Sequence, residues 1–328
     1  MDMQLSDWFA KLKSHSQLEL FTFQKINNSL AHLFVKRDDL IHPEISGNKL
    51  RKLEGNLLAA NKLGAKQLMT FGGAFSNHLL ASAAAAKAIG FPIIGKVRGE
   101  ELTEQSNSLL KRCAELGMQL QFISRSQFAQ EKHQQGLHDV QNLPTWIIPE
   151  GGANPEGIWA CAQIYPEAVS QNNNQHFDAV FIAQGTTTTS LGVLASIPPT
   201  TQLYVVPVLK GFDAISEMQA LATMAQNNPF TTNFQFNWQQ VTVLDTYHHG
   251  GYAKTTPELL NFINTFSSSN QFNSTKYFQI EPTYTAKALF ALHDLLLKAD
   301  PRLLPPTIPT PEPKRILFVH TGGIHANF

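Results

Sequence analysis

One loop that could do chemistry follows an apolar segment and consists of Gly185, Thr186, Thr187, Thr188 and Thr189. Backbone N–H groups and hydroxyls at the start of a helix can bind an anion, and a phosphate is the natural occupant. The alternative is that a threonine only caps the helix, but a single threonine would be enough for that. The loop contains neither a P-loop nor a GxGxxG dinucleotide motif.

Lys49 is a candidate nucleophile. It follows Gly47 and Asn48, and we expect a helix over residues 50–63. A lysine at the start of a helix lies against the helix macrodipole, which favours a lowered pKa and a neutral, nucleophilic amine. Most lysines on helices are solvated surface groups, so this local context alone leaves Lys49 as one candidate among several.

Three further loops are rich in glycine and in polar side chains: residues 72–78, 151–154 and 320–323. The elements around them alternate between short apolar runs and helix-like segments. We expect strands over residues 67–71, 92–97, 119–123, 145–149, 178–183, 202–209, 241–244 and 315–320, and helices over 76–89 and 103–116. Strands that are apolar on both faces and are separated by helices indicate a doubly wound α/β fold with parallel sheets. In such sheets, ligands bind beyond the carboxyl ends of the strands, where these loops lie.

The composition excludes several classes of protein. Lysine plus arginine and aspartate plus glutamate are balanced at 25 each, which gives no electrostatic reason to expect nucleic acid or a membrane as a partner. No segment resembles a membrane span or a signal peptide. Cys113 and Cys161 are expected to be buried thiols, and His248 and His249 to be loop residues, because adjacent side chains diverge. We therefore expect a cytoplasmic enzyme without a metal site.

Several motifs together resemble one family of enzymes. Residues 35–40 and 47–54 (VKRDDL and GNKLRKLE) are similar to the cofactor-lysine region of the tryptophan-synthase-β-like pyridoxal-phosphate (PLP) enzymes. The similarity is to the branch that contains D-cysteine desulfhydrase and 1-aminocyclopropane-1-carboxylate (ACC) deaminase. Further matches follow in the family's order at residues 76–78, 148–154, 251–252, 281–288 and 316–323. Each motif is weak alone, but their order along the chain is specific.

The resemblance implies roles around the cofactor, pyridoxal 5′-phosphate. Lys49 would hold it as a Schiff base and then move protons. Lys52, one helical turn from Lys49, would reach the phosphate together with the loop 185–189. Asn77 would donate a hydrogen bond to the ring's 3′-oxygen, and Thr285 would face the pyridine nitrogen.

The resemblance also implies a substrate site. Ser76, Asn77 and His78 would bind the substrate, with its carboxylate at Ser76 and Asn77 above the helix N-terminus. Thr321 and Gly322 would line the same site. Tyr252 and Tyr284 would face the cofactor and the substrate as catalytic groups. From the residues alone, Ser76 could equally be only a helix cap, and the two tyrosines could be ordinary core aromatics.

The residues at two positions distinguish the two reactions of the branch. ACC deaminases typically carry Glu where this chain has Thr285 and Leu where it has Thr321, so the chain resembles the desulfhydrases at both. We expect α,β-elimination from a small amino acid, D-cysteine first, giving pyruvate, sulfide and ammonia. ACC deamination to α-ketobutyrate, or PLP binding without turnover, are the alternatives. Departures from the family's pattern at the threonine loop, at residues 79–80 and at 325–327 leave a different substrate open.

The resemblance also implies a domain organisation. In this branch, two doubly wound open-sheet domains of the fold type II class hold the cofactor in the cleft between them. The large domain would comprise residues 1–51 and 162–328, and the smaller inserted α/β domain residues 52–161. A homodimer is usual for the branch.

Overall fold

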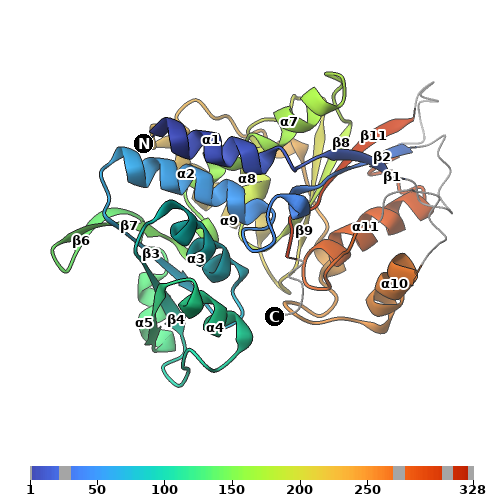
Figure 1. The fold of residues 1–328 in the computed structure, drawn as a ribbon. Coiled ribbons are helices and arrows are strands. Elements are labelled where there is room, and N and C mark those ends of the chain that lie inside the picture. The colour runs from blue at the N-terminus through green and yellow to red at the C-terminus, as the bar shows by residue number, and fades with distance from the viewer. Residues whose placement is uncertain (1, 22–30, 269–277, 305–312, 324–328) are drawn as a thin grey trace.

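The protein contains two β-sheets covered by helices (Figure 1). The computed structural model describes residues 2–21, 31–268, 278–304 and 313–323. One sheet has six strands in the order β1-β2-β11-β8-β9-β10, and the other has five in the order β5-β4-β3-β7-β6. Neighbouring strands are parallel, except that β1 runs antiparallel to β2 and β6 to β7. The predicted α/β architecture is therefore confirmed.

Short apolar strands form both sheets. All six residues of β8 are buried, as expected for a strand that is covered on both faces. The six-stranded sheet comprises β1 (Leu18–Phe21), β2 (Ala31–Lys36), β8 (Ala179–Gln184), β9 (Gln202–Pro207), β10 (Val241–Val243) and β11 (Lys314–Val319). The five-stranded sheet comprises β3 (Gln67–Gly72), β4 (Ile93–Arg98), β5 (Met118–Ile123), β6 (Gly136–Val140) and β7 (Leu143–Ile148).

Helices cover both faces of the six-stranded sheet. Phe181 of β8 belongs to the apolar cluster under α11, and its neighbour Ile182 belongs to the cluster under α8. The α-helices are α1 (Asp2–Lys13), α2 (Asn48–Lys62), α3 (Asn77–Ile89), α4 (Ser108–Glu115), α5 (Arg125–Glu131), α6 (Pro155–Cys161), α7 (Ile164–Gln171), α8 (Thr188–Leu194), α9 (Ala214–Gln226), α10 (Pro257–Ser268) and α11 (Thr285–Leu297). Short 3-10 turns are η1 (Asp38–Leu40), η2 (Glu150–Gly152), η3 (Trp238–Gln240) and η4 (Asp245–His248).

Helix α4 corrects one expectation. It begins at Ser108 rather than at residue 103, because the Asn107 side chain accepts a hydrogen bond from the Leu110 N–H and caps the helix there. The antiparallel strand β6 was not predicted. Its sequence, GLHDV, is largely polar, and its position depends on pairing with β7.

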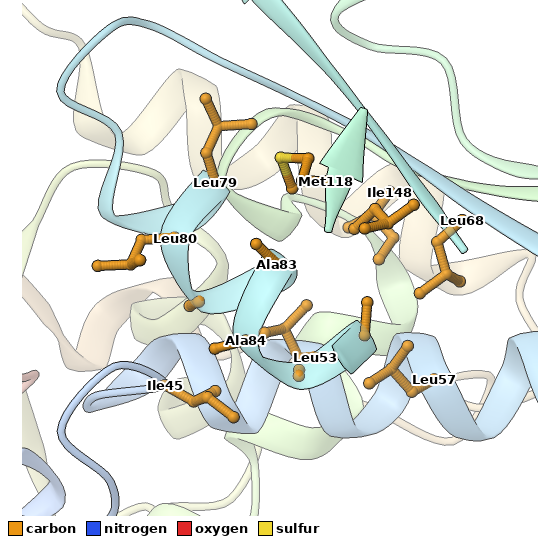
Figure 2. Close-up of a cluster of buried hydrophobic side chains, with 14 of the residues drawn as sticks. Ile45, Leu53, Leu57, Leu68, Leu79, Leu80, Ala83, Ala84, Met118 and Ile148 are labelled. Atoms are coloured by element: carbon orange, nitrogen blue, oxygen red, sulfur yellow. The ribbon is translucent and has the colours of Figure 1, made fainter. Parts of the chain in front are cut away.

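The alanine-rich helix α3 packs closely against α2 and the five-stranded sheet (Figure 2). Ser76 Oγ accepts a hydrogen bond from the Leu79 N–H at the helix start, and Gly90 ends the helix in a left-handed conformation. The small side chains of Ala83 and Ala84 let α3 approach Leu53 of α2 (Figure 2). This packing fixes the first turn of α3 relative to α2.

The two sheets come from different parts of the chain. All strands of the five-stranded sheet lie within residues 67–148, and those of the six-stranded sheet lie before and after that segment. The predicted boundary between residues 51 and 52 falls inside α2, and the division into domains remains a prediction. No helix in the described ranges is long and apolar enough to cross a membrane.

Helices α2 and α6 touch through their backbones. A Cβ atom on Gly55 of α2 would lie 2.0 Å from the carbonyl oxygen of Glu156 in α6. Only glycine allows this approach, so the contact fixes the spacing of the two helices.

We predict that Gly55→Ala lowers the free energy of unfolding by more than about 2 kcal/mol, because the new methyl group must push the two helices apart. Gly64→Ala is the matched control, because a Cβ there would meet nothing within 4 Å and its φ is +75°. That control should cost only about 1 kcal/mol of backbone strain. Urea denaturation of the three proteins measures both values, and equal losses would contradict the steric argument.

Candidate active site

A pocket of about 450 Å³ lies where the carboxyl ends of strands from both sheets meet. Its lining follows β3, β4 and β7 of the five-stranded sheet and β8, β9 and β11 of the six-stranded sheet. This is where ligands bind in parallel α/β sheets. Of the predicted site residues, the pocket is lined by Lys49, Ser76, Asn77, His78, Gly185, Thr186, Tyr252, Tyr284, Thr321 and Gly322. The pocket is not lined by Lys52, Thr187, Thr188, Thr189 or Thr285.

The backbone before Lys49 is locked against the loop after β11. Gly47 has a φ of +64°, and a Cβ there would lie 1.9 Å from the Thr321 carbonyl oxygen. That same oxygen accepts a hydrogen bond from the Asn48 N–H at 3.2 Å. Glycine is therefore required at position 47, both for its conformation and for the close approach.

Lys49 lies in the first turn of α2, with its Nζ 3.0 Å from Asn48 Oδ1. Burial lowers the pKa of the Lys49 amine to about 8. At neutral pH a useful fraction of this amine is therefore neutral and nucleophilic.

Lys52 is the second buried lysine and lies one turn further along α2. Its Nζ donates hydrogen bonds to Thr186 Oγ1 at 2.7 Å and to the Gly151 carbonyl oxygen at 3.1 Å. Burial, and next the nearby charge of Lys49, lower the pKa of the Lys52 amine to about 7. Within the described residues neither lysine forms a salt bridge. An anion bound here would compensate this buried positive charge.

The four threonines make separate contacts. Thr186 accepts the hydrogen bond from Lys52, and Thr189 Oγ1 accepts one from Asn48 Nδ2 at 2.9 Å. Thr187 occupies the N-cap position of α8, but its side chain accepts no capping hydrogen bond. The simple capping alternative is therefore not supported. The loop instead connects α8 to Lys52 and Asn48 of α2.

His78 is buried in the wall of the pocket. Thr70 Oγ1 donates to the Ile148 carbonyl oxygen, so it accepts from His78 Nε2, at 2.9 Å. The ring's Nδ1 is therefore unprotonated, and it has no hydrogen-bond partner in the part of the chain that is described. Burial holds the pKa of His78 well below its usual value. A neutral acceptor remains at the edge of the pocket.

Two tyrosines flank the pocket on the side of the six-stranded sheet. Tyr284 packs over Gly185, where a Cβ would lie 2.7 Å from its ring. Tyr252 is half exposed, and its ring centroid lies 6.1 Å from that of Tyr284 at an interplanar angle of 74°. Burial raises the pKa of Tyr284, so its hydroxyl stays protonated at neutral pH. Both tyrosines line the pocket, and their catalytic roles remain a prediction.

Thr285 is fully buried at the start of α11, and its hydroxyl contacts Glu281 rather than the pocket. Its Oγ1 accepts a hydrogen bond from the Glu281 N–H at 2.9 Å. In return, Glu281 Oε1 accepts the N–H groups of Tyr284 and Thr285, each at 2.7 Å. This cap of α11 was not predicted from the sequence.

Several lining residues were also missed by the sequence reasoning. They lie in the same strand-end loops as the predicted ones, which was the available signal: Ser46, Gly73, Phe75, Arg98, Glu150 and Leu209. Ser46 Oγ is a buried polar atom without a hydrogen-bond partner among the described atoms. Together with His78 Nδ1, it gives the pocket two polar atoms that could bind a polar ligand.

A buried ion pair fixes the start of α2 to neighbouring elements. Arg51 Nε and Nη2 donate to Asp38 Oδ2 and Oδ1 at 2.6 and 2.7 Å, and both side chains are fully buried. Glu167 of α7 accepts from the same guanidinium. The helix that carries Lys49 is thereby fixed to α7 and to η1, the short turn that begins at Asp38, two residues after the end of β2.

Curated relatives are similar to this chain over most of its length. A putative 1-aminocyclopropane-1-carboxylate deaminase of Pyrococcus furiosus is 29% identical over 307 residues, which cover 91% of this chain and 86% of the relative. A D-cysteine desulfhydrase of Serratia proteamaculans is 28% identical over 311 residues, which cover 90% and 88%.

A solved structure described as an ACC deaminase homologue has the same fold. Its TM-score is 0.73 at 24% sequence identity, over 96% of this chain and 91% of that one. The family model described as "Pyridoxal-phosphate dependent enzyme" matches residues 15–322. This chain belongs to the pyridoxal-phosphate-dependent enzyme family.

Proposed function

We propose that this enzyme catalyses α,β-elimination from a small amino acid with a β leaving group, D-cysteine first, to give pyruvate, sulfide and ammonia. The observation that carries the proposal is a pair of lysines with lowered pKa values: Lys49 lines the pocket and has a pKa of about 8, and the buried Lys52, with a pKa of about 7, donates to Thr186 of the lining. Lys49 would supply a nucleophilic amine, and Lys52 would bind the cofactor's phosphate.

The pocket's donors and acceptors fit pyridoxal 5′-phosphate. Lys52, Thr186 and the start of α8 would hold its phosphate, and Asn77 its 3′-oxygen. Lys49 would bind its aldehyde carbon covalently. The buried polar atoms without partners, Ser46 Oγ and His78 Nδ1, are consistent with a polar ligand in this pocket. When bound, the cofactor supplies an electron sink that stabilises negative charge at the substrate's α-carbon.

The proton chemistry would belong to Lys49. Burial lowers the pKa of its amine to about 8, so a minority of it is neutral at pH 7, and Nζ of this neutral form can accept the α-proton of a bound amino acid. Asn48 Oδ1, 3.0 Å away, orients the amine. The protonated Tyr284 hydroxyl would serve the leaving group, and the half-exposed Tyr252 would close the pocket beside it.

The substrate's carboxylate would bind at the first turn of α3. Ser76 and Asn77 line the pocket there, at the N-terminus of a 13-residue helix. The free backbone N–H groups and the helix dipole favour an anion at this end. His78, Thr321 and Gly322 complete this wall.

Two positions support elimination from D-cysteine over opening of ACC. Thr285 stands where ACC deaminases typically carry Glu, so this position supplies no carboxylate that would keep a pyridine nitrogen protonated, and its hydroxyl is bonded to Glu281. Thr321 is the second desulfhydrase-like residue. Relatives carry both names, so ACC deamination is the alternative function, and PLP binding without turnover is a second. We further propose a cytoplasmic homodimer in which residues 52–161 form a separate smaller domain.

We predict that kcat/KM for D-cysteine exceeds that for ACC by at least about 100-fold, which corresponds to about 2.7 kcal/mol of transition-state discrimination. Sulfide and pyruvate release measures the first reaction and α-ketobutyrate release the second. L-cysteine and β-chloro-D-alanine test the stereochemistry and the leaving group. Faster turnover of ACC would overturn the choice of D-cysteine. If no amino acid were turned over, the protein would bind the cofactor without catalysing a reaction.

We predict that Lys52→Gln weakens binding of pyridoxal phosphate by about 100-fold, because a charge-assisted hydrogen bond to a buried phosphate is lost. Lys66→Gln is the matched control, because Lys66 is exposed and does not line the pocket. The cofactor's dissociation constant is measured by absorbance titration of the cofactor-free protein. Equal affinities in the two variants would show that Lys52 does not bind the phosphate.

We predict that the cofactor-free protein becomes more stable as pH rises from 7 to 9.5, relative to Lys49→Met. The folded protein loses the Lys49 proton near pH 8 and the unfolded chain near 10.5, so the unfolded chain holds more protons in between. The stability difference should change by about 2 kcal/mol over this range. Urea denaturation at several pH values measures it, and parallel pH profiles would show that Lys49 has an ordinary pKa.

A further inference from the structure

A second pocket, of about 440 Å³, lies away from the catalytic one. It is formed by the end of α2, the start of the β6–β7 hairpin, the first residues of α6, and the end of α9 with the loop that follows. None of its lining residues lines the catalytic pocket. Its volume falls within the range of small-molecule sites, roughly 300–1,000 Å³.

Glu156 lines this second pocket and carries a buried carboxylate without a cation. The residue is only 6% exposed, and burial raises the pKa of its carboxyl. Oε1 accepts a hydrogen bond from the neutral Asn228 Nδ2 at 2.9 Å. Across the described ranges, no lysine, arginine or histidine forms a salt bridge with Glu156. A bound ammonium would compensate this charge.

The same pocket is also lined by an exposed lysine that is available to bind an anion. Lys62, near the end of α2, places its Nζ 5.9 Å from the centroid of the Phe230 ring. It pairs with no carboxylate in the described structure, Glu156 included, although both line this pocket. A ligand's carboxylate would bind here. A ligand that carries both an ammonium and a carboxylate, a zwitterion, would therefore fit Glu156 and Lys62 together.

Much of the remaining wall is apolar, beside the amide side chains of Gln135, Asn227 and Asn228. Trp146 is 3% exposed, and its Nε1 already donates to Asn56 Oδ1 at 3.0 Å, so its ring offers an apolar surface. Leu63, Leu137 and Met224 also line the pocket, with 53%, 42% and 43% of their surfaces exposed. A ligand with an apolar side chain would cover them and gain hydrophobic free energy.

We propose that this second pocket binds a free amino acid with an apolar side chain. The ammonium would bind at Glu156, the carboxylate at Lys62, and the side chain against Trp146 and Met224. The site is linked to the catalytic pocket through chain segments that reach both. Lys62 is at the opposite end of the helix that carries Lys49, and Glu156 follows the loop 150–154, part of which lines the catalytic pocket.

Calorimetric titration of the holoenzyme with L-leucine tests the proposal. Glu156→Gln keeps an acceptor for Asn228 but removes the charge, and Lys62→Gln removes the cation. We expect each to weaken leucine binding by at least about tenfold, equivalent to about 1.4 kcal/mol. The matched controls Glu217→Gln and Lys66→Gln alter exposed residues outside the pocket, and should leave the affinity unchanged.

Two leucine analogues test the need for both charges. Isoamylamine lacks the carboxylate and 4-methylpentanoate lacks the ammonium, so both should bind more weakly than leucine. Leucine should also change the fluorescence of wild-type protein but not of Trp146→Phe to the same extent. Binding at the catalytic pocket would persist in Glu156→Gln, and leucine binding that persists unchanged there would overturn the proposal. So would a dimer that Met224→Glu converts to monomers, because a second copy would then cover the pocket.

Discussion

The amines of Lys49, which is partly buried and lines the pocket, and of the buried Lys52 lie one helical turn apart, and among the described residues no carboxylate forms a salt bridge with either. Such a pair is costly in an apolar environment unless one amine becomes neutral and an anion lies near the other. The lowered pKa values of both lysines mean that their neutral forms are favoured relative to those of exposed lysines. The hydroxyl of Thr186 and the start of α8 surround the place beside Lys52 where an anion would bind. Much of the architecture near the pocket serves to hold these two amines in place.

The strongest of these supports are themselves buried polar contacts. The Asp38–Arg51 ion pair fixes α2 to η1 from one side, and the close approach of Gly47 to the Thr321 carbonyl fixes it from the other. Breaking a buried pair by removing one partner leaves an uncompensated charge, which is strongly destabilising. The position of Lys49 is therefore determined by residues far apart in the sequence. They meet because parallel strands from both sheets end at the same cleft.

Much of this arrangement could be predicted from the sequence. Apolar strands such as β8 identify parallel sheets, and glycine-rich loops after them identify the pocket. The cap formed by Glu281 could not be foreseen, because it depends on how residues 281–285 fold back on themselves. The polar strand β6 was missed because its pairing with β7, not its own pattern, makes it a strand. Arg98 was missed because an arginine at a strand end carries no signal until the strand is placed beside the pocket.

The central claim is that Lys49 is the lysine that binds the cofactor covalently. Borohydride reduction of the purified holoenzyme, followed by proteolysis and mass spectrometry, tests it directly. The account predicts one added pyridoxyl-phosphate mass, on the peptide at Lys49, and none in Lys49→Ala. Two other buried lysines are internal references: Lys52, and Lys287, whose Nζ donates to the Gly251 carbonyl oxygen at 2.7 Å. The cofactor's mass on either of them, or an adduct that survives in Lys49→Ala, would contradict the account.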